Sequence, residues 1–307
     1  VPGMAQIRSS LNQVRVILII LLLIIPLLLM GCWNRREVND LNLVTAIGID
    51  RMLAEGKPRY LVTLHTLNSI QSRRGTDSGG LQFSTATPGG ILSMEGDTVY
   101  DAIRNFTLRS SRQMFLAHTQ VLIIGEETAR EGINQILDIC LRHRDIRMRT
   151  WVVVCEGTAQ EALQAHSDIE AELSVEIDKL LTKNQPRTDK TVAADIRKTA
   201  HALFTPGLEL SVSNMKLFAP PEMSFSTGKE TGHGTTPGGN SLVEGSDGQA
   251  GEMPPQKKSF ALSGAAVFQG DRMVGRFNEE ETQGLLFITG QARSGIIPFA
   301  FEASEIN

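Results

Sequence analysis

The chain has 307 residues, 21% of them charged, and a formal net charge of −4, which is the composition of an ordinary globular protein of one or two domains. Aromatic residues make up only 5% of it and basic residues are not in excess, so no nucleic-acid partner is expected. The three cysteines are too few for a disulfide framework.

The first 31 residues have the pattern of an export signal. Arg8 and Arg15 are followed by an apolar run from Val16 to Met30. A membrane-spanning helix needs roughly 20 apolar residues, and this run is shorter, as the core of a signal peptide is. We therefore expect residues 1–31 to be a lipoprotein-type signal peptide.

The end of this run resembles the lipobox of bacterial lipoproteins, which is a Leu, two variable or small residues and a Cys. Leu29, Met30 and Gly31 precede Cys32. In a lipobox the cysteine thiol receives a diacylglyceryl group and the chain is cleaved before it, and two acyl chains suffice for stable anchoring. We expect lipidation at Cys32. The alternative is a retained signal anchor with an incidental cysteine.

Strand and helix patterns alternate over residues 32–200, which we predict to be the first domain. Apolar runs predict strands over 43–49, 60–67, 120–124 and 150–155, and residues 69–80 have the composition of an exposed loop. Helices are expected after Asp97, over about 126–143, after a Thr158–Glu161 capping box, and over about 171–183 and 190–203. Such alternation indicates a sheet covered by helices.

Residues 201–307 are predicted to form a second domain. Its strands are expected over 208–212, over 260–268, after a hairpin turn at Gly270–Asp271, and over 296–301, with a helix over 278–287. The Gly- and Pro-containing segment 222–258 has little to bury, so we expect a flexible insertion. The fold class is therefore mixed α/β (α+β), with two domains that each have a sheet and flanking helices.

Catalytic motifs are absent from the sequence, so no enzyme, catalytic residue, metal site or cofactor is predicted. No pair among the six histidines, at positions 65, 118, 143, 166, 201 and 233, has metal-ligand spacing on one helix face. The run Glu279–Glu281 would suit acid–base chemistry, but acids in the first turn of a helix capped by Asn278 are the favoured interpretation.

Two further features leave alternatives open. Cys140 and Cys155 lie in apolar runs, which favours two buried thiols, although a disulfide between them is possible in an oxidising compartment. Four arginines cluster around His143, at positions 142, 144, 147 and 149. They form either a patch that faces anionic lipid or an acidic partner, or a solvated helix end, which is the favoured interpretation.

Three segments carry a family resemblance. Residues 31–40 (Gly-Cys-Trp-Asn-Arg-Arg-Glu-Val-Asn-Asp) run into the strand end Ala46–Asp50. Residues 118–126 form a strand-to-helix junction, and the third segment combines 264–268, 278–286 and 294–297. Together they resemble the Ger(x)C family, the lipoprotein C subunits of nutrient germinant receptors in spore formers. The family pattern Cys-Trp-Asp-x-x-Glu has Asn34 in place of the Asp here.

The resemblance implies a lipid anchor at Cys32 in the inner spore membrane, with the folded part on the extracytoplasmic face. It also implies assembly with the membrane-embedded A and B subunits and a role in the response to nutrients. Family members usually continue into a third, C-terminal domain, which we expect this chain to lack because it ends at Asn307. The rival hypothesis is a free-standing extracytoplasmic lipoprotein that binds a small ligand.

Overall fold

A computed structural model of the chain describes residues 15–24, 40–54, 56–67, 90–165, 167, 169–218 and 258–295. The chain divides into two units, Val1–Leu41 and Asn42–Asn307. In the first unit, residues 15–24 form a helix. Among the described residues, no helix has both the length and the apolar character needed to cross a membrane. Cys32, the loop 69–80, most of the insertion 222–258 and the expected strand 296–301 lie outside the described residues.

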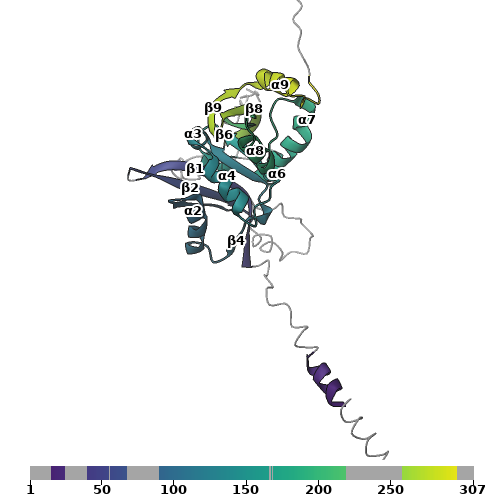
Figure 1. Ribbon diagram of the computed structural model, residues 1–307. Coiled ribbons are helices and arrows are strands. Elements are labelled where there is room, and N and C mark those ends of the chain that lie inside the picture. Colours follow the sequence, from purple (N-terminus) through teal and green to yellow (C-terminus); the bar gives the residue numbers. More distant parts are fainter. Residues whose placement is uncertain are drawn as a thin grey trace, which may run out of the picture. The chain divides into compact units, whose positions relative to one another are not determined.

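The second unit is built on one mixed sheet with the strand order β3-β2-β1-β5-β6-β7-β8-β9 (Figure 1). The strand β4 stands outside this order and pairs with β1. The four central strands β1, β5, β6 and β7 are parallel, and the strands on either side of them are antiparallel. The strands are β1 (Leu41–Ala54), β2 (Lys57–Thr66), β3 (Ile91–Gly96), β4 (Gln113–Phe115), β5 (Val121–Gly125), β6 (Trp151–Cys155), β7 (Ser211–Phe218), β8 (Ser259–Gln269) and β9 (Arg272–Phe277).

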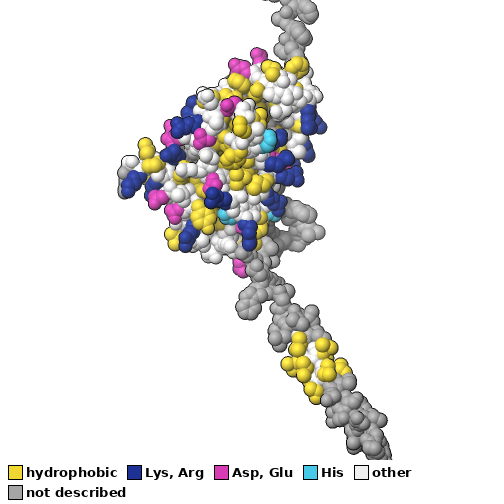
Figure 2. Space-filling model, in the orientation of Figure 1, with side chains coloured by type: hydrophobic (Ala, Val, Ile, Leu, Met, Phe, Trp, Pro, Cys, Tyr) yellow, Lys and Arg dark blue, Asp and Glu magenta, His cyan; other side chains and the backbone are white. Residues whose placement is uncertain are grey.

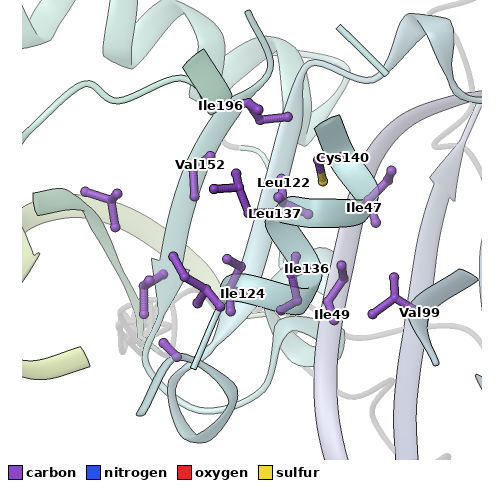
Figure 3. Close-up of a cluster of buried hydrophobic side chains, with 14 of the residues drawn as sticks. Ile47, Ile49, Val99, Leu122, Ile124, Ile136, Leu137, Cys140, Val152 and Ile196 are labelled. Atoms are coloured by element: carbon purple, nitrogen blue, oxygen red, sulfur yellow. The ribbon is translucent and has the colours of Figure 1, made fainter. Parts of the chain in front are cut away.

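Both faces of the central strands are buried, as the continuous apolar runs predict. Successive side chains of a strand point to opposite faces, so Leu122 and Val152 enter one hydrophobic cluster while Val121 and Val153 enter the other. The first cluster is covered by the helices α2 (Val99–Asn105), α3 (Glu126–Glu131), α4 (Asn134–Arg142) and α8 (Ile196–Phe204). Figure 3 shows Ile136 and Leu137 of α4 packed over the strand residues.

The second cluster is covered by α5 (Ala159–Gln164) and α6 (Leu173–Lys179), with Leu181 of the π-helical turn Leu180–Asn184 that continues α6. The short helix α7 (Gln185–Thr188) follows. At the far end of the sheet α9 (Glu279–Ile288) packs against β8 and β9 through Leu286 and Phe277. The mixed α/β class predicted from the sequence is confirmed.

One predicted helix, 126–143, is two helices in the structure. Gly132 separates α3 from α4 with φ at +127°, a backbone conformation that residues with a Cβ rarely adopt. The carbonyl of Asp271, on the β8–β9 turn, accepts the backbone N–H of Ile133 at 2.9 Å. The break is therefore set by a contact with a distant segment, which helical periodicity does not report.

We expected separate sheets on either side of residue 200, and the structure has one sheet instead. β6 and β7 pair in parallel through Val153–Ser213, Val154–Asn214 and Cys155–Met215. β7 then pairs with β8 and β8 with β9, so strands from both predicted domains extend the same sheet. The predicted hairpin turn at Gly270–Asp271 is present between β8 and β9, which pair at Gln269 and Arg272.

Candidate functional site at the carboxyl edge of the sheet

Asp50 of β1 lies against the beginning of α5 at the edge where β5 and β6 end. Its Oδ1 accepts the N–H of Ala159 at 2.7 Å and its Oδ2 accepts the N–H of Gln160 at 2.9 Å. Burial raises the pKa of Asp50, and these two hydrogen bonds oppose the rise. A Cβ at Gly125 would fall on the Asp50 carboxylate, so this position needs glycine. Asp50 therefore fixes α5 to the sheet.

Glu126, the first residue of α3, is the centre of an ion-pair network at the same edge. Arg130 donates to its Oε1 from Nε at 3.2 Å and from Nη2 at 2.9 Å, and Arg276 of β9 pairs with its Oε2. Desolvation alone would raise the pKa of Glu126, but the hydrogen bonds from Arg130 and Arg276 outweigh it and the pKa is lowered. Glu126 is thus held as a carboxylate.

The network continues from Arg276 across the sheet. Its Nε donates to Oδ1 of Asn214 on β7 at 3.2 Å, and Nδ2 of Asn214 donates to Glu156 at 3.2 Å. Charge-assisted hydrogen bonds, which are stronger than neutral ones, therefore join four residues that are distant in the chain. They are Glu126 of α3, Arg276 of β9, Asn214 of β7 and Glu156, which follows β6. The sequence does not indicate this network, since its members are far apart in the chain and share no motif.

A cavity of about 460 Å³ opens beside these residues. Asp50, Arg51, Glu126, Glu127, Thr128, Arg130, Gly157 and Thr158 line it. The carboxyl edge of parallel strands is where α/β sheets usually bind ligands. Arg51 is paired with Glu131 at 2.7 Å and Arg130 with Glu126, so both arginines that line the cavity already have an acidic partner. Such a lining suits a small polar molecule held by hydrogen bonds better than an anion.

Groups with nucleophilic or metal-binding chemistry do not gather here. Cys155 at the end of β6 is a buried free thiol, as is Cys140 on α4, and the two lie in clusters on opposite faces of the sheet. Burial raises the pKa of Cys140 to about 12 and also raises that of Cys155, so both thiols stay protonated. Within the described ranges, no group of three or more His, Cys, Asp or Glu side chains could hold a metal ion.

The run Glu279–Glu281 is a helix cap, as favoured from the sequence. Asn278 accepts the N–H of Glu281 at 2.8 Å, and the Glu281 carboxylate accepts the N–H of Asn278 at 2.8 Å, which is a capping box. Glu279 pairs with Lys190 at 2.7 Å and accepts from Ser263 at 2.9 Å, and the hydrogen bond from Lys190 lowers its pKa. These acids stabilise the attachment of α9.

A second attachment of the C-terminal elements depends on Asp189, which no pattern in the sequence singles out. It follows α7 with φ at +49°, a left-handed conformation that Asp tolerates better than most residues. Its buried Oδ2 accepts the N–H groups of Arg293 and Ser294, each at 2.7 Å. The segment that follows α9 is thereby fixed to the helical layer around α7.

The four arginines around His143 differ in their surroundings: two lie beside an acidic side chain and two are exposed before β6. Arg142 pairs with Asp138 at 2.8 Å and Arg144 lies 3.8 Å from Asp145. Arg142, Arg144 and Asp145 line a cavity of about 530 Å³ with Tyr100, Ile139 and His143. Arg147 and Arg149 are exposed and lie just before β6. The predicted lipidation site, Cys32, lies outside the described residues.

Comparison with known proteins places this α/β protein among proteins of spore germination. Residues 34–217 match the family model described as "Spore germination protein N-terminal domain", and residues 263–307 match "Spore germination B3/ GerAC like, C-terminal". The first match alone covers more than half of the chain. The chain belongs to the GerAC-like family of spore germination proteins.

Three relatives from Bacillus subtilis (strain 168) illustrate the likeness. Spore germination protein KC is 30% identical over 61% of this chain and 45% of its own length. Spore germination protein YndF is 25% identical over 87% of this chain, and spore germination protein B3 is 20% identical over 89%, each across 61% of the relative. The chain thus spans about half to three fifths of the length of these relatives. No solved structure matches it.

The expectation that the chain lacks the C-terminal domain of its family is wrong. The match to the C-terminal family model begins at residue 263, inside β8, and includes β9 and α9. We predicted these elements as part of a second domain over residues 201–307, which opens with the alternating strand 208–212. The first family match ends at residue 217 and the second begins at 263, so the Gly- and Pro-containing segment 222–258 lies between them.

Proposed function

We propose that the chain is the lipid-anchored C subunit of a spore nutrient germinant receptor and is needed for the response to germinants. The observation that carries the proposal is the pair of family matches, over 34–217 and 263–307, which together leave only a short N-terminal stretch and the segment 218–262 unmatched. The lipobox-like sequence that ends in Cys32 lies directly before the first match.

In this role, acyl chains on Cys32 hold the protein in the inner spore membrane, and the folded unit lies on the extracytoplasmic side. It assembles there with the membrane-embedded A and B subunits. The paired charges of the carboxyl-edge network and the protonated, buried thiols support a role in binding and assembly without catalysis. We therefore propose that the subunit is not an enzyme.

The alternative is a free-standing lipoprotein that binds a small ligand, for which the cavity beside Asp50 and Glu126 would be the site. The two functions differ in their dependence on partners. A receptor subunit would co-purify with integral membrane subunits and would be needed for germination by some nutrient. A free-standing binding protein would bind its ligand alone, and its loss would leave germination unchanged.

The test is nutrient-triggered germination of spores that lack the gene, compared with spores in which the wild-type gene or its Cys32→Ala variant is restored. We expect the deletion to slow the response to at least one nutrient, the wild type to restore it and Cys32→Ala to fail. A normal response of the deletion strain to every nutrient tested would contradict the receptor role and favour the ligand-binding alternative.

The anchor is tested separately by labelling with a fatty-acid analogue. Cys32→Ala should abolish incorporation, whereas Cys140→Ala should retain it because that thiol is buried. Equal labelling of Cys32→Ala and the wild type would contradict the assignment of Cys32 as the lipidation site. The germination phenotype of the deletion strain would still test the receptor role by itself.

A further inference from the structure

The amino ends of the central strands lie at the edge of the sheet opposite the carboxyl-edge cavity. Gln120, just before β5, donates its N–H to the carbonyl of Thr45 on β1 at 2.9 Å. Trp151, the first residue of β6, donates to the carbonyl of Gln120 at 2.8 Å. Residues 147–149 directly precede β6, so they lie at the same edge as the beginning of β1 at Leu41.

Helix α8 begins beside this segment. The N–H of Ile196 donates to the carbonyl of Thr150 at 2.9 Å, and that of Arg197 donates to the carbonyl of Met148 at 3.1 Å. The first turn of α8 therefore adds its basic side chains to those of residues 147–149. We call the resulting surface the basic face, and it consists of Arg147, Met148, Arg149, Arg197, Lys198 and Phe204.

The positive charge of the basic face is only partly compensated within the structure. Arg147 and Arg149 are exposed and have no ion pair among the described residues, unlike Arg142 and Arg144 nearby. Lys198 donates to the carbonyl of Ala193 at 2.9 Å, a neutral partner. Asp195 lies 3.6 Å from Arg197 but is buried and caps α8 through the N–H of Lys198.

The same elements carry two exposed apolar side chains, Met148 between the two arginines and Phe204 at the end of α8. Met148 is 41% exposed and Phe204 is 63% exposed. Figure 2 shows hydrophobic side chains over α4 and α8 with Lys and Arg side chains beside them. Exposed apolar residues among lysines and arginines are typical of surfaces that lie on an anionic membrane, where the apolar groups enter the interface and the cations meet the headgroups.

We propose that the basic face binds the anionic headgroups of a lipid bilayer. The choice of a bilayer over an acidic protein rests on the proposed anchor at Cys32. Eight residues, 33–40, separate Cys32 from β1, and a fully extended chain of this length reaches about 30 Å. A lipid on Cys32 would therefore keep the beginning of β1 within about 30 Å of the membrane surface. The basic face lies at the same edge of the sheet, so the anchor would hold it on the membrane side of the folded unit.

The test uses the chain from residue 32 onward with Cys32→Ala, so that neither an acyl chain nor the apolar run Val16–Met30 contributes, and vesicles of phosphatidylcholine with or without phosphatidylglycerol. Binding is measured by flotation. We expect tighter binding to the vesicles that contain phosphatidylglycerol, and a preference that falls as salt is raised. Arg147→Glu with Arg149→Glu should weaken that binding on the order of tenfold or more, since each basic residue near an anionic surface contributes severalfold.

The matched control reverses two exposed charges elsewhere, Lys57→Glu on β2 and Arg272→Glu on β9. This control variant changes the net charge by the same amount and should leave most of the binding intact. Both double variants should give the wild-type circular dichroism spectrum, which shows that they are folded. Equal weakening by the two pairs, or equal binding to the two kinds of vesicle, would overturn the proposal. Because no acyl chain is involved, neither outcome depends on whether Cys32 is lipidated.

Discussion

His65 is a titratable side chain buried on β2, and its Nδ1 lies 2.9 Å from the hydroxyl of Thr45 on β1. Burial lowers the pKa of His65 below its ordinary value of 6.5, because the charged imidazolium would lose its hydration. The same cause raises the pKa of Asp50 and of both buried thiols. Burial in the sheet therefore favours the neutral forms of these groups.

The lowered pKa of His65 predicts that the protein loses stability in mild acid. Below pH 6.5 the unfolded chain takes up a proton at His65 that the folded protein resists, so the unfolded state binds more protons. The stability from keeping this ring neutral is present above pH 6.5 and is lost as the pH falls. Urea unfolding of the wild type from about pH 7 to about pH 5 should show this decline.

The matched variants are His65→Gln and His201→Gln. The first removes the buried ring and should flatten the decline, whereas His201 is exposed on α8, so its substitution should leave the decline as in the wild type. An equal decline in His65→Gln and the wild type would show that other groups cause the acid sensitivity.

At the scale of helices and strands, local signals predicted most elements. The helix over 278–287 was found from Asn278 and Glu281, which form the cap of α9, and the strand over 120–124 was found from its apolar run. The break between α3 and α4 was missed because apolar positions continue across it. Gly132 needs its positive φ, and a Cβ there would lie 2.7 Å from the Asp271 carboxylate, a neighbour 139 positions along the chain.

Two glycine substitutions of opposite sign test this explanation. Gly132→Ala should lower the free energy of unfolding by about 1–3 kcal/mol, because alanine is strained at this φ and meets Asp271. Gly284→Ala should raise it by roughly 0.5–1 kcal/mol, because Gly284 is exposed within α9 and has open space around its Cα. Denaturant unfolding measures both. A neutral Gly132→Ala would mean that the helix break does not depend on glycine.

At the scale of the whole unit, the fold class could be predicted but the pairing of the strands could not. Alternating strand and helix patterns indicate a covered sheet wherever they occur. The parallel order β1-β5-β6-β7, by contrast, joins segments separated by whole helices, and it is this order that brings Asp50, Glu126 and Gly157 to one edge. The site could therefore be found only from the structure, although Asp50 and Glu126 lie within the segments that carry the family resemblance.

The ion pair between Glu126 and Arg276 joins the two family regions, since Glu126 lies in the N-terminal match and Arg276 in the C-terminal match. Their side chains are 23% and 27% exposed, and both make further charge-assisted hydrogen bonds. A double-mutant cycle with Glu126→Gln and Arg276→Gln should therefore give a coupling energy of roughly 1–3 kcal/mol in the free energy of unfolding.

The pair Asp138–Arg142 on α4 is the matched control, because its side chains are 54% and 80% exposed and both lie in one helix. The cycle with Asp138→Asn and Arg142→Gln should give only about 0.3–0.5 kcal/mol. If the pair between the family regions is no stronger than this control, the network does not hold them together and the continuous sheet alone does. A strong coupling with a single unfolding transition would mean that the N-terminal region and the elements β8, β9 and α9 fold as one cooperative unit.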